Sequence, residues 1–402
     1  MRISVISPFV DRQHGTERAV AEFLAHLESQ HNDHIDLYAQ RVSDLELKSP
    51  SPAGLESAGG ITWHRVPSVP GPHLLQFLGW FFLNRFARWR LERAGGNAPS
   101  VLFSPGINAL DADVILVHAV FHRVADLQKS HVTGGLRGRH RKLYYATLCD
   151  LERRIYKNPL VTLAAVSRRT AEQLASYFGR SDVTVIPNGV DSSYFSAEVT
   201  KAMRDRSRQQ WEISPQDFVI LLVGNDWRNK GLLALLQAFA QSVALPLRLL
   251  VVGQDQQAFF RSQAKRLGVS ERVQFFAPVS DVRTFYAAAD ALVAPSLEDS
   301  FNLPVLEAMS CGLPVVVSPR AGVSEWLTDS LDSIVMQDPE NADELARAIH
   351  KLALDSGLRV SIVANAIQTA KRLSWANHSE KLRSVLASAV EQKLLRSSKR
   401  GL

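Results

Sequence analysis

The sequence predicts an α/β protein made of two doubly wound, Rossmann-like domains that face each other across a cleft. Short apolar runs typical of buried parallel strands alternate with helical patterns along most of the chain. The chain has 402 residues, too many for one ordinary core and suitable for two. Turn-forming residues at 187–191 separate the halves, so we expect domains at 1–195 and 196–375. A C-terminal helix, 376–402, is expected to pack back on the first domain.

Composition and charge narrow the class of protein. The apolar fraction of 46% and the charged fraction of 21% are those of an ordinary soluble globular protein. A net charge of +6 favours anionic partners such as nucleotide sugars, anionic lipids or nucleic acid. Cys149 and Cys311 lie far apart, which indicates a reducing compartment and neither a disulfide framework nor a zinc site. The sequence shows no signal peptide and no apolar run of the roughly 20 residues that a membrane span needs, so we expect a cytoplasmic protein.

The first domain opens with a strand, a polar loop and a helix. The strand covers 3–6, the amphipathic helix covers 19–27, and Gly15 stands in the loop. One glycine at such a position is a weak signal, compatible with a plain turn and with a functional loop. Three further strands are predicted at 35–38, 61–66 and 101–104, with a loop over 43–60.

A helix at 74–93 combines aromatic and basic side chains. Its aromatic residues include Trp80, Phe81, Phe82 and Trp89, and its arginines are Arg85, Arg88, Arg90 and Arg93. The apolar face is wider than packing on a core requires, and this combination is typical of helices in an anionic membrane interface. The alternative is a core helix whose basic last turn suits the helix dipole. Both interpretations remain open from the sequence.

The strand at 114–117 leads into His118, with His122 one helical turn later. A histidine at the carboxyl end of a parallel strand is either structural or faces a ligand. Asp111 and Asp113 precede this strand instead of following it, so we interpret them as a polar turn and not as metal ligands.

A basic run follows, made of Arg137, Arg139, Arg141 and Lys142. It fits a solvated helix face, or contact with lipid phosphate or nucleic acid. No nucleic-acid-binding motif accompanies it, so we exclude nucleic acid as the main partner.

The second domain carries cations in its first loop. An apolar strand at 218–223 is followed by a loop at 224–231 and by a helix at 232–243. The loop contains Arg228 and Lys230, and cations between a strand end and a helix start are well placed to bind a pyrophosphate.

The stretch from Ala294 to Pro319 places acids in the matching position of a later strand. A buried strand at 291–294 runs into a loop with Glu298 and Asp299. Pro304 then opens a helix, Gly312 closes it, and the next strand follows. Acids therefore sit at a strand's carboxyl end beside a helix N-terminus, where open α/β sheets bind phosphorylated ligands.

This stretch resembles the donor-sugar motif of family 4 retaining glycosyltransferases, written Glu-x₇-Glu and followed by Cys-Gly-x-Pro-Val-Val. Glu307 matches the second acid, and Asp299, eight positions earlier, falls in the slot of the first. Glu298 is a neighbour that could substitute for Asp299. The resemblance covers nearly all of residues 160–375 with specific motifs and residues 1–160 loosely. It implies the glycosyltransferase-B fold, with the donor bound by the second domain and the acceptor by the first.

The resemblance also implies roles for individual residues. Lys230 and Arg228 would bind the donor diphosphate, Glu307 the ribose hydroxyls and Asp299 the sugar hydroxyls. His118 would orient the sugar from the first domain. The other residues that we assign to donor binding are Gly15, Gly224, Val279, Glu298, Ser300, Phe301, Asn302 and Leu303. We expect no metal and no cofactor, because cations and a helix N-terminus would stabilise the leaving diphosphate.

The expected function is retaining transfer of a sugar from a UDP- or GDP-sugar to a hydroxyl group. The expected acceptor is lipid-linked or a cell-envelope polysaccharide or lipopolysaccharide, reached by reversible docking on the inner face of a membrane. Two alternatives stay open: a nucleotide-sugar epimerase of the same fold, and a non-catalytic scaffold of a polysaccharide assembly complex.

Overall fold

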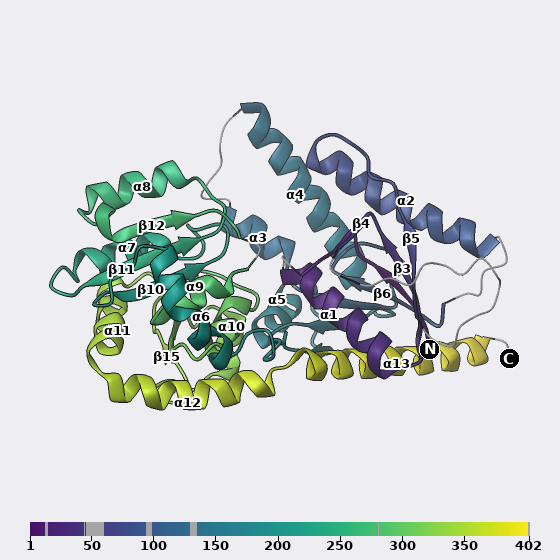
Figure 1. The fold of residues 1–402 in the computed structure, drawn as a ribbon. Coiled ribbons are helices and arrows are strands. Elements are labelled where there is room, and N and C mark those ends of the chain that lie inside the picture. The colour runs from purple at the N-terminus through teal and green to yellow at the C-terminus, as the bar shows by residue number, and fades with distance from the viewer. Residues whose placement is uncertain are drawn as a thin grey trace. The chain divides into compact units, whose positions relative to one another are not determined.

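The chain divides into two compact units (Figure 1). Unit 1 comprises Met1–Pro187 and Trp375–Leu402, and unit 2 comprises Asn188–Ser374. The first division falls inside the turn cluster at 187–191, before the boundary at 195 that the sequence suggested. The computed structural model describes residues 1–12, 15–43, 45, 60–93, 99–128, 135–279 and 281–400. Most of the predicted loop at 43–60 lies outside these residues.

Unit 1 is built on a seven-stranded parallel sheet with the strand order β5-β3-β1-β6-β7-β8-β9. The order grows outward in both directions from the neighbours β1 and β6, which makes the sheet doubly wound, as predicted. The strands are β1 (Arg2–Ile6), β3 (His34–Ala39), β5 (Gly60–Arg65), β6 (Val101–Pro105), β7 (Val114–Val117), β8 (Thr162–Ala165) and β9 (Val183–Val185). A separate parallel pair is formed by β2 (Phe9–Val10) and β4 (Arg41–Val42).

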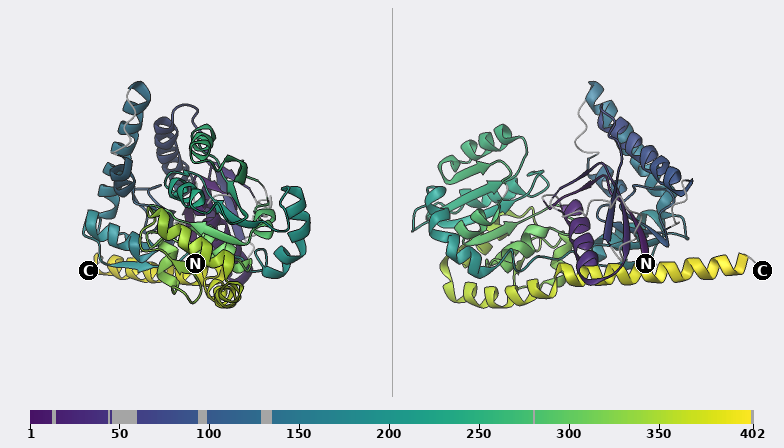
Figure 2. Two further views of the ribbon diagram at one scale, coloured as in Figure 1. Left: turned by 90° about the vertical axis from the view of Figure 1, so that its left-hand side faces the viewer. Right: turned by 45° about the vertical axis from the view of Figure 1, so that its right-hand side comes forward.

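The helices of unit 1 are α1 (Gly15–Gln30), α2 (His73–Arg93), α3 (Phe121–Gln128), α4 (Gly135–Tyr156), α5 (Arg168–Phe178) and α13 (Trp375–Arg400). Local chemistry sets the bounds of α5: the Ser167 side chain accepts a hydrogen bond from the Thr170 N–H at the start, and Gly179 ends it with a φ of 71°. Helix α13 packs against α1 and the sheet (Figure 2) and buries Leu382 and Leu386.

Helix α2 packs on the sheet of unit 1 through a stripe that contains polar residues. Trp80, Phe81, Asn84 and Arg88 are buried. Arg88 donates two hydrogen bonds to Asp111, of 2.9 and 3.0 Å. Burial by itself would raise the pKa of Asp111, but the hydrogen bonds and charge of Arg88 outweigh it and hold that pKa below its usual value. Asp111 is therefore a structural partner of α2.

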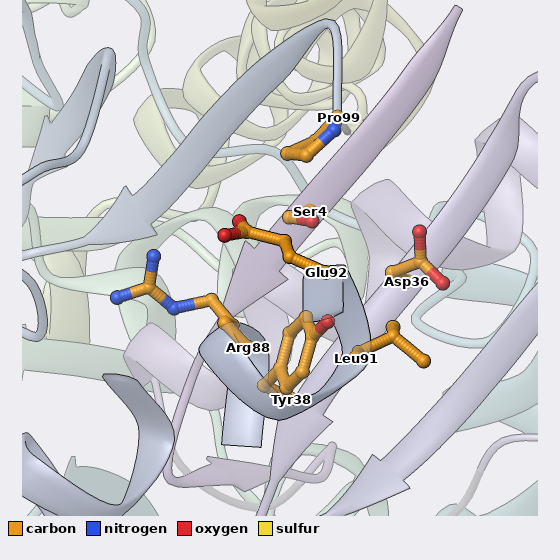
Figure 3. Close-up of a pocket in the computed structure, with 7 residues that line it drawn as sticks. All are labelled: Ser4, Asp36, Tyr38, Arg88, Leu91, Glu92 and Pro99. Atoms are coloured by element: carbon orange, nitrogen blue, oxygen red, sulfur yellow. The ribbon is translucent and has the colours of Figure 1, made fainter. Parts of the chain in front are cut away.

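A small pocket lies beside this helix, lined by Ser4, Asp36, Tyr38, Arg88, Leu91, Glu92 and Pro99 (Figure 3). Asp36 accepts hydrogen bonds from Arg2 Nε at 2.8 Å and from His64 Nε2 at 2.9 Å. Because these contacts use the Asp36 carboxylate to join neighbouring strands, we interpret the pocket as a packing feature.

Unit 2 is built on a six-stranded parallel sheet with the order β12-β11-β10-β13-β14-β15. The strands are β10 (Phe218–Val223), β11 (Leu247–Val252), β12 (Val273–Phe276), β13 (Ala291–Ala294), β14 (Val315–Val317) and β15 (Ile334–Val335). Strand order reverses between β10 and β13, so the loops that follow these two strands flank the switch point. At such a point the carboxyl ends of open sheets bind ligands.

The helices around this sheet are α6 (Ala197–Gln210), α7 (Leu232–Ala240), α8 (Gln257–Arg266), α9 (Arg283–Ala288), α10 (Leu303–Ser310), α11 (Ala342–Leu354) and α12 (Ser356–Arg372). Among the described residues of both units, no helix has both the length and the hydrophobicity to span a bilayer. Ile220, Leu249 and Val293 from the strands and Phe239 and Ile349 from the helices belong to one buried core. This core fixes the strand ends from which the site loops extend.

Candidate functional site

Two loops of unit 2 are held together at the switch point. The loop after β10 contains Asn229, and the loop after β13 contains Leu297 and Glu298. The Leu297 N–H donates to the Asn229 carbonyl oxygen at 2.7 Å, and Asn229 Nδ2 donates to the Glu298 carbonyl oxygen at 2.8 Å. Gly231 permits this approach, because a Cβ there would lie 2.0 Å from the Pro295 oxygen. The loop that contains Lys230 and the loop that contains Glu298 and Asp299 therefore form one surface, which we call the clasp.

Lys230 and Asp299 form an ion pair across these loops. Their Nζ and Oδ2 atoms are 2.6 Å apart, and the side chains are 17% and 16% exposed. The other carboxylate oxygen of Asp299 accepts the Phe301 N–H at 3.1 Å. Gly224 leaves room for the lysine, since a Cβ there would lie 2.7 Å from Lys230 Cε. The sequence predicted both charged residues, and the structure adds that they are partners.

Glu298 differs from Asp299 in what it contributes to the clasp. Its main-chain oxygen accepts a hydrogen bond from the Asn229 side chain, whereas the Asp299 carboxylate accepts one from the Lys230 ammonium group. Of the two acids, Asp299 is therefore the one whose carboxylate contacts Lys230, although its side chain is one methylene shorter than the glutamate of the motif.

Glu307 lies deeper, on α10, and is 4% exposed. Its Oε2 atom accepts a hydrogen bond of 2.6 Å from the hydroxyl of Tyr286 on α9. Tyr286 is buried and packs edge-on against Phe195. Sequence reasoning did not assign a role to Tyr286. The only signal was a tyrosine among small apolar residues, Ala287 and Ala288, where a buried hydroxyl needs a partner.

The N-terminus of α10 begins at an unusual backbone position. Asn302 precedes the helix with a φ of +79°, in the left-handed region that asparagine tolerates better than most residues. Its Nδ2 atom donates to the Ser296 hydroxyl at 3.1 Å. Phe301 and Leu303 are buried on either side, while Ser300 is half-buried. The first N–H groups of α10 thus follow directly after the Asp299 loop.

Arg228 and Val279 lie apart from the Lys230–Asp299 contact. The Arg228 guanidinium lies over the ring of Phe259, 5.3 Å from its centroid, and the side chain is exposed. Val279, after β12, is 40% exposed. The structure therefore places Lys230 against Asp299 and Arg228 against Phe259.

In unit 1, His118 stands at the carboxyl end of β7, and Gly15 is the first residue of α1. Burial lowers the pKa of His118 to about 3, with a smaller contribution from His378, so the ring is neutral at pH 7. The pKa of His378 is itself lowered to about 4 by burial, while its Nδ1 atom donates to the Pro187 oxygen at 2.8 Å. A neutral imidazole offers hydrogen bonds and no charge.

The segment after His118 is held by Glu152, which sequence reasoning missed. The buried Glu152 carboxylate accepts the N–H groups of Phe121 and His122, at 2.6 and 2.9 Å, and the His122 Nδ1 atom at 2.8 Å. His122 therefore has a structural role, which leaves His118 as the candidate of the pair. A glutamate within a helical pattern gave no sequence signal for this contact.

Family comparisons cover most of the chain. Residues 13–194 match the family described as Glycosyltransferase Family 4, and residues 203–369 match Glycosyl transferases group 1.

Curated relatives align over part of their length. The chain is 31% identical to lipopolysaccharide glucosyltransferase WaaG of Escherichia coli (strain K12) over 45% of this chain and 50% of WaaG. It is 31% identical to D-inositol 3-phosphate glycosyltransferase of Actinosynnema mirum over 53% of this chain and 54% of that protein. The aligned part thus spans about half the length of these curated relatives.

Solved structures share the fold over nearly the whole chain. A crystal structure of WaaG, described as a glycosyltransferase involved in lipopolysaccharide biosynthesis, has a TM-score of 0.74 at 20% identity, covering 96% of this chain and 99% of that one. Anabaena Alr3699/HepE in complex with UDP and glucose has a TM-score of 0.71 at 18% identity, with the same coverage. The two family matches and this shared fold show that the chain belongs to the family 4, group 1 glycosyltransferases of the glycosyltransferase-B fold.

Proposed function

We propose that the chain is a retaining glycosyltransferase that moves a sugar from a UDP- or GDP-sugar to a hydroxyl of a lipid-linked or cell-envelope polysaccharide acceptor. The observation that carries the proposal is the clasp at the switch point of unit 2, where Lys230, Asp299 and the start of α10 meet. Family membership and the UDP complex of Alr3699/HepE support a nucleotide-sugar donor.

In the proposed reaction the bond between the sugar's anomeric carbon and the diphosphate breaks, and its electron pair goes to the diphosphate. The acceptor oxygen bonds to the same face of that carbon, and its proton passes to a leaving phosphate oxygen. Lys230 and the N–H groups at the start of α10 would stabilise the departing charge. We therefore propose no metal and no cofactor in this step.

Binding the donor would rearrange the Lys230–Asp299 ion pair. A diphosphate attracts the Lys230 ammonium more strongly than one carboxylate does, so Asp299 is released to accept hydrogen bonds from sugar hydroxyls. Glu307 would accept hydrogen bonds from the ribose, with Tyr286 fixing its orientation. For His118 we propose hydrogen bonding to an uncharged hydroxyl, which suits its neutral ring.

The test is calorimetric binding of a panel of UDP- and GDP-sugars to the full chain. Glu307→Ala should weaken binding of the preferred donor about ten- to hundredfold, because a hydrogen bond to a charged group contributes about 1.5–3 kcal/mol. Tyr286→Phe, which keeps the ring and the carboxylate, is the matched control and should lose less. Equal donor affinity in wild type and a folded Glu307→Ala variant would overturn the ribose assignment.

Turnover assays separate the alternatives. Lys230→Ala should lower turnover strongly, and EDTA should leave wild-type turnover largely intact. Complete loss on chelation, restored by magnesium or manganese, would refute the metal-free step. Conversion of the donor without any acceptor would indicate an epimerase, and failure to bind any nucleotide sugar would indicate a scaffold.

The acceptor part of the proposal rests on the outer face of α2. Phe82, Phe86 and Trp89 are exposed there, at 65%, 52% and 43%. The rings of Phe86 and Trp89 stack with centroids 5.6 Å apart, and the Arg93 guanidinium lies 4.3 Å from the Trp89 centroid. With the exposed Arg85 and Arg90, this face joins aromatic area to positive charge, which suits an anionic lipid surface.

The sequence left two interpretations of this helix, and its buried and exposed stripes bear on them differently. Trp80 and Phe81 belong to the core, as the core interpretation required, whereas Phe82 and Trp89 do not. Arg88 is buried on the Asp111 side, so it is not available to lipid. On α4, Arg139 and Lys142 are exposed, and the side chain of Arg137 lies outside the described residues.

Vesicle co-sedimentation tests the membrane proposal. Wild type should bind vesicles that contain anionic lipid, with binding that falls as salt rises. An Arg85/Arg90/Arg93 triple alanine variant should bind less, and a Phe82/Phe86 double serine variant should lose binding even at low salt. A Lys265/Arg266 double alanine variant on α8 is the control for net charge. Wild type that ignores anionic vesicles at low salt would refute the docking and leave the donor site untouched.

A further inference from the structure

We propose that His26, His31 and Glu380 form a binding site for Zn²⁺ or a similar divalent cation in unit 1. His26 Nε2 and His31 Nε2 lie 2.9 and 2.8 Å from the same carboxylate oxygen, Glu380 Oε1. The two rings meet edge to face with centroids 5.9 Å apart. The three candidate ligand atoms all lie within 4.8 Å of one another.

The ligand set matches the chemistry of zinc. Zinc bonds to imidazole nitrogen at about 2.0–2.1 Å and to carboxylate oxygen at about 2.0–2.2 Å, usually with four ligands. Neighbouring ligands of a tetrahedral ion with such bonds are roughly 3.3 Å apart. The present contacts would need to lengthen by a few tenths of an ångström to admit the ion. A water molecule would supply the fourth position, because three protein ligands leave it open.

The position of the cluster favours an ion that can enter from solvent. Glu380 is 52% exposed, while the two histidines are partly buried. One cation near it is already paired: Arg383, one turn later on α13, donates to Asp33 at 2.8 Å. Asp33 also accepts from the amino group of Met1. A second cation would therefore not be opposed by an unpaired positive charge on Arg383.

Another cluster of suitable residues, His122, Cys149 and Glu152, is a poorer candidate. The Glu152 carboxylate already accepts three hydrogen bonds, two of them from main-chain N–H groups that it holds in place. Its ligation to a metal would break those contacts. Variants of Cys149 therefore serve as a control that tells the two clusters apart.

An ion at His26, His31 and Glu380 would join the end of α1 to α13. His26 lies in the last part of α1, His31 directly follows the helix, and Glu380 belongs to the first turns of α13. Helices α1 and α13 lie side by side (Figures 1 and 2). Zinc would thus add a bond between segments that are far apart in the sequence and increase the stability of unit 1. The proposal does not depend on the reaction, because none of the donor-site residues of unit 2 takes part.

The experiment uses the full chain, stripped with EDTA, dialysed and titrated with zinc chloride by calorimetry, with thermal unfolding followed in parallel. Wild type should bind one zinc that is displaced by EDTA, and zinc should raise its melting temperature. His31→Ala and Glu380→Gln should weaken this binding at least about tenfold and abolish the thermal shift. Glu380→Gln retains an oxygen that accepts both imidazole hydrogen bonds, so its fold is expected to survive.

Two control variants sharpen the test. His73→Ala removes an exposed histidine of α2, and Cys149→Ser removes a ligand of the other cluster; both should bind zinc as wild type does. The proposal is wrong if wild type binds no zinc, if Glu380→Gln binds it equally, or if Cys149→Ser alone loses it. Donor binding is measured separately. Loss of the zinc shift with intact donor binding would therefore contradict the zinc site and leave the proposed function untouched. Loss of donor binding with an intact zinc shift would contradict the proposed function and leave the zinc site untouched.

Discussion

The ion pair between Lys230 and Asp299 is the residue-level feature with the widest consequences. In the proposed function each of these groups binds a different part of the donor, whereas in the structure they neutralise each other. An exposed pair contributes little stability, and this one is largely shielded from solvent. We interpret it as a contact that keeps Lys230 oriented until a diphosphate binds in place of Asp299.

The first prediction compares the neighbouring acids. Asp299→Asn should reduce turnover more than Glu298→Gln, because the Asp299 carboxylate forms the ion pair with Lys230, whereas Glu298 accepts Asn229 through its main-chain oxygen. Both substitutions preserve size, so the comparison isolates the charge. The measurement is steady-state turnover with saturating donor. A larger loss of turnover in Glu298→Gln would indicate that Glu298, and not Asp299, contacts the sugar.

The second prediction concerns pH. Burial holds His378 neutral in the folded protein, with a pKa of about 4, whereas the unfolded chain takes up a proton near pH 6.5. Its contribution to stability is therefore intact above pH 6.5 and decreases as pH falls from 6.5 towards 4. At pH 5.5 this loss is on the order of 1 kcal/mol.

His378→Gln tests this directly, since glutamine can still donate to the Pro187 oxygen and does not titrate. Urea midpoints at pH 7.5 and 5.5 should differ less for His378→Gln than for wild type. His118, also neutral through burial, should leave part of the acid sensitivity in the variant. His73→Gln, at an exposed histidine, is the control and should behave as wild type. Equal acid sensitivity in His378→Gln and wild type would contradict the prediction.

The sequence was sufficient to locate the candidate residues of unit 2 but not their contacts. Lys230 and Asp299 could be placed in two loops, because each follows a strand that apolar runs identify. That the loops touch depends on β10 and β13 being neighbours, and strand order is set by packing over the whole sheet. The hydrogen bond from the Tyr286 hydroxyl to Glu307 and those from the first N–H groups of α3 to Glu152 depend on packing in the same way.

At the scale of elements, α2 reverses the usual arrangement of a surface helix. Polar Asn84 and charged Arg88 are buried, and Phe82, Phe86 and Trp89 are exposed. Aromatic residues occur on every side of this helix, so its periodicity could not indicate which side faces the core. The buried arginine is explained by Asp111, whereas the exposed Phe86 and Trp89 rings stack on each other at the surface.

The third prediction separates the arginines of α2. Arg88→Ala should lower the free energy of unfolding by about 1.5–3 kcal/mol, because it leaves Asp111 without its two charge-assisted hydrogen bonds. Arg85→Ala, at an exposed position, should change stability by less than about 0.5 kcal/mol. Urea denaturation of both variants makes the comparison. Similar losses in the two would show that Arg88 is not the buried anchor of the helix.

The general pattern of elements was predictable, and the exceptions are short or composite. The alternation of apolar strands and helical patterns identified two doubly wound sheets, which the structure confirms. Strands of two residues, such as β2, β4 and β15, carry too few side chains for an alternating pattern to appear. Helix α12 begins at Ser356, because the Asp355 side chain caps it by accepting the Leu358 N–H.

At the scale of the whole molecule, α13 completes unit 1 from the far end of the chain. It buries Leu382 and Leu386 within that unit. Full burial of one leucine contributes about 1.5–3 kcal/mol, and a domain is stable by only about 5–15 kcal/mol. The helix is therefore part of the core of unit 1.

The fourth prediction follows from the contribution of α13 to the core of unit 1. Leu386→Ala should destabilise unit 1 by about 2–5 kcal/mol and leave unit 2 unchanged. Calorimetry with and without a bound nucleotide sugar distinguishes the units, since the donor should shift only the transition of unit 2. Leu394→Ala, at an exposed position further along α13, is the control. Equal destabilisation of both transitions by Leu386→Ala would mean that the units do not unfold separately.

The division of unit 1 between the two ends of the chain also orders events on the ribosome. Translation produces every residue of unit 2 by Ser374, while unit 1 still lacks α13. The half that is second in the sequence is thus the first that can fold completely. Until Leu382 and Leu386 emerge from the ribosomal tunnel, their place in the nascent first half stays uncovered, and chaperones that bind apolar surface have their longest opportunity there.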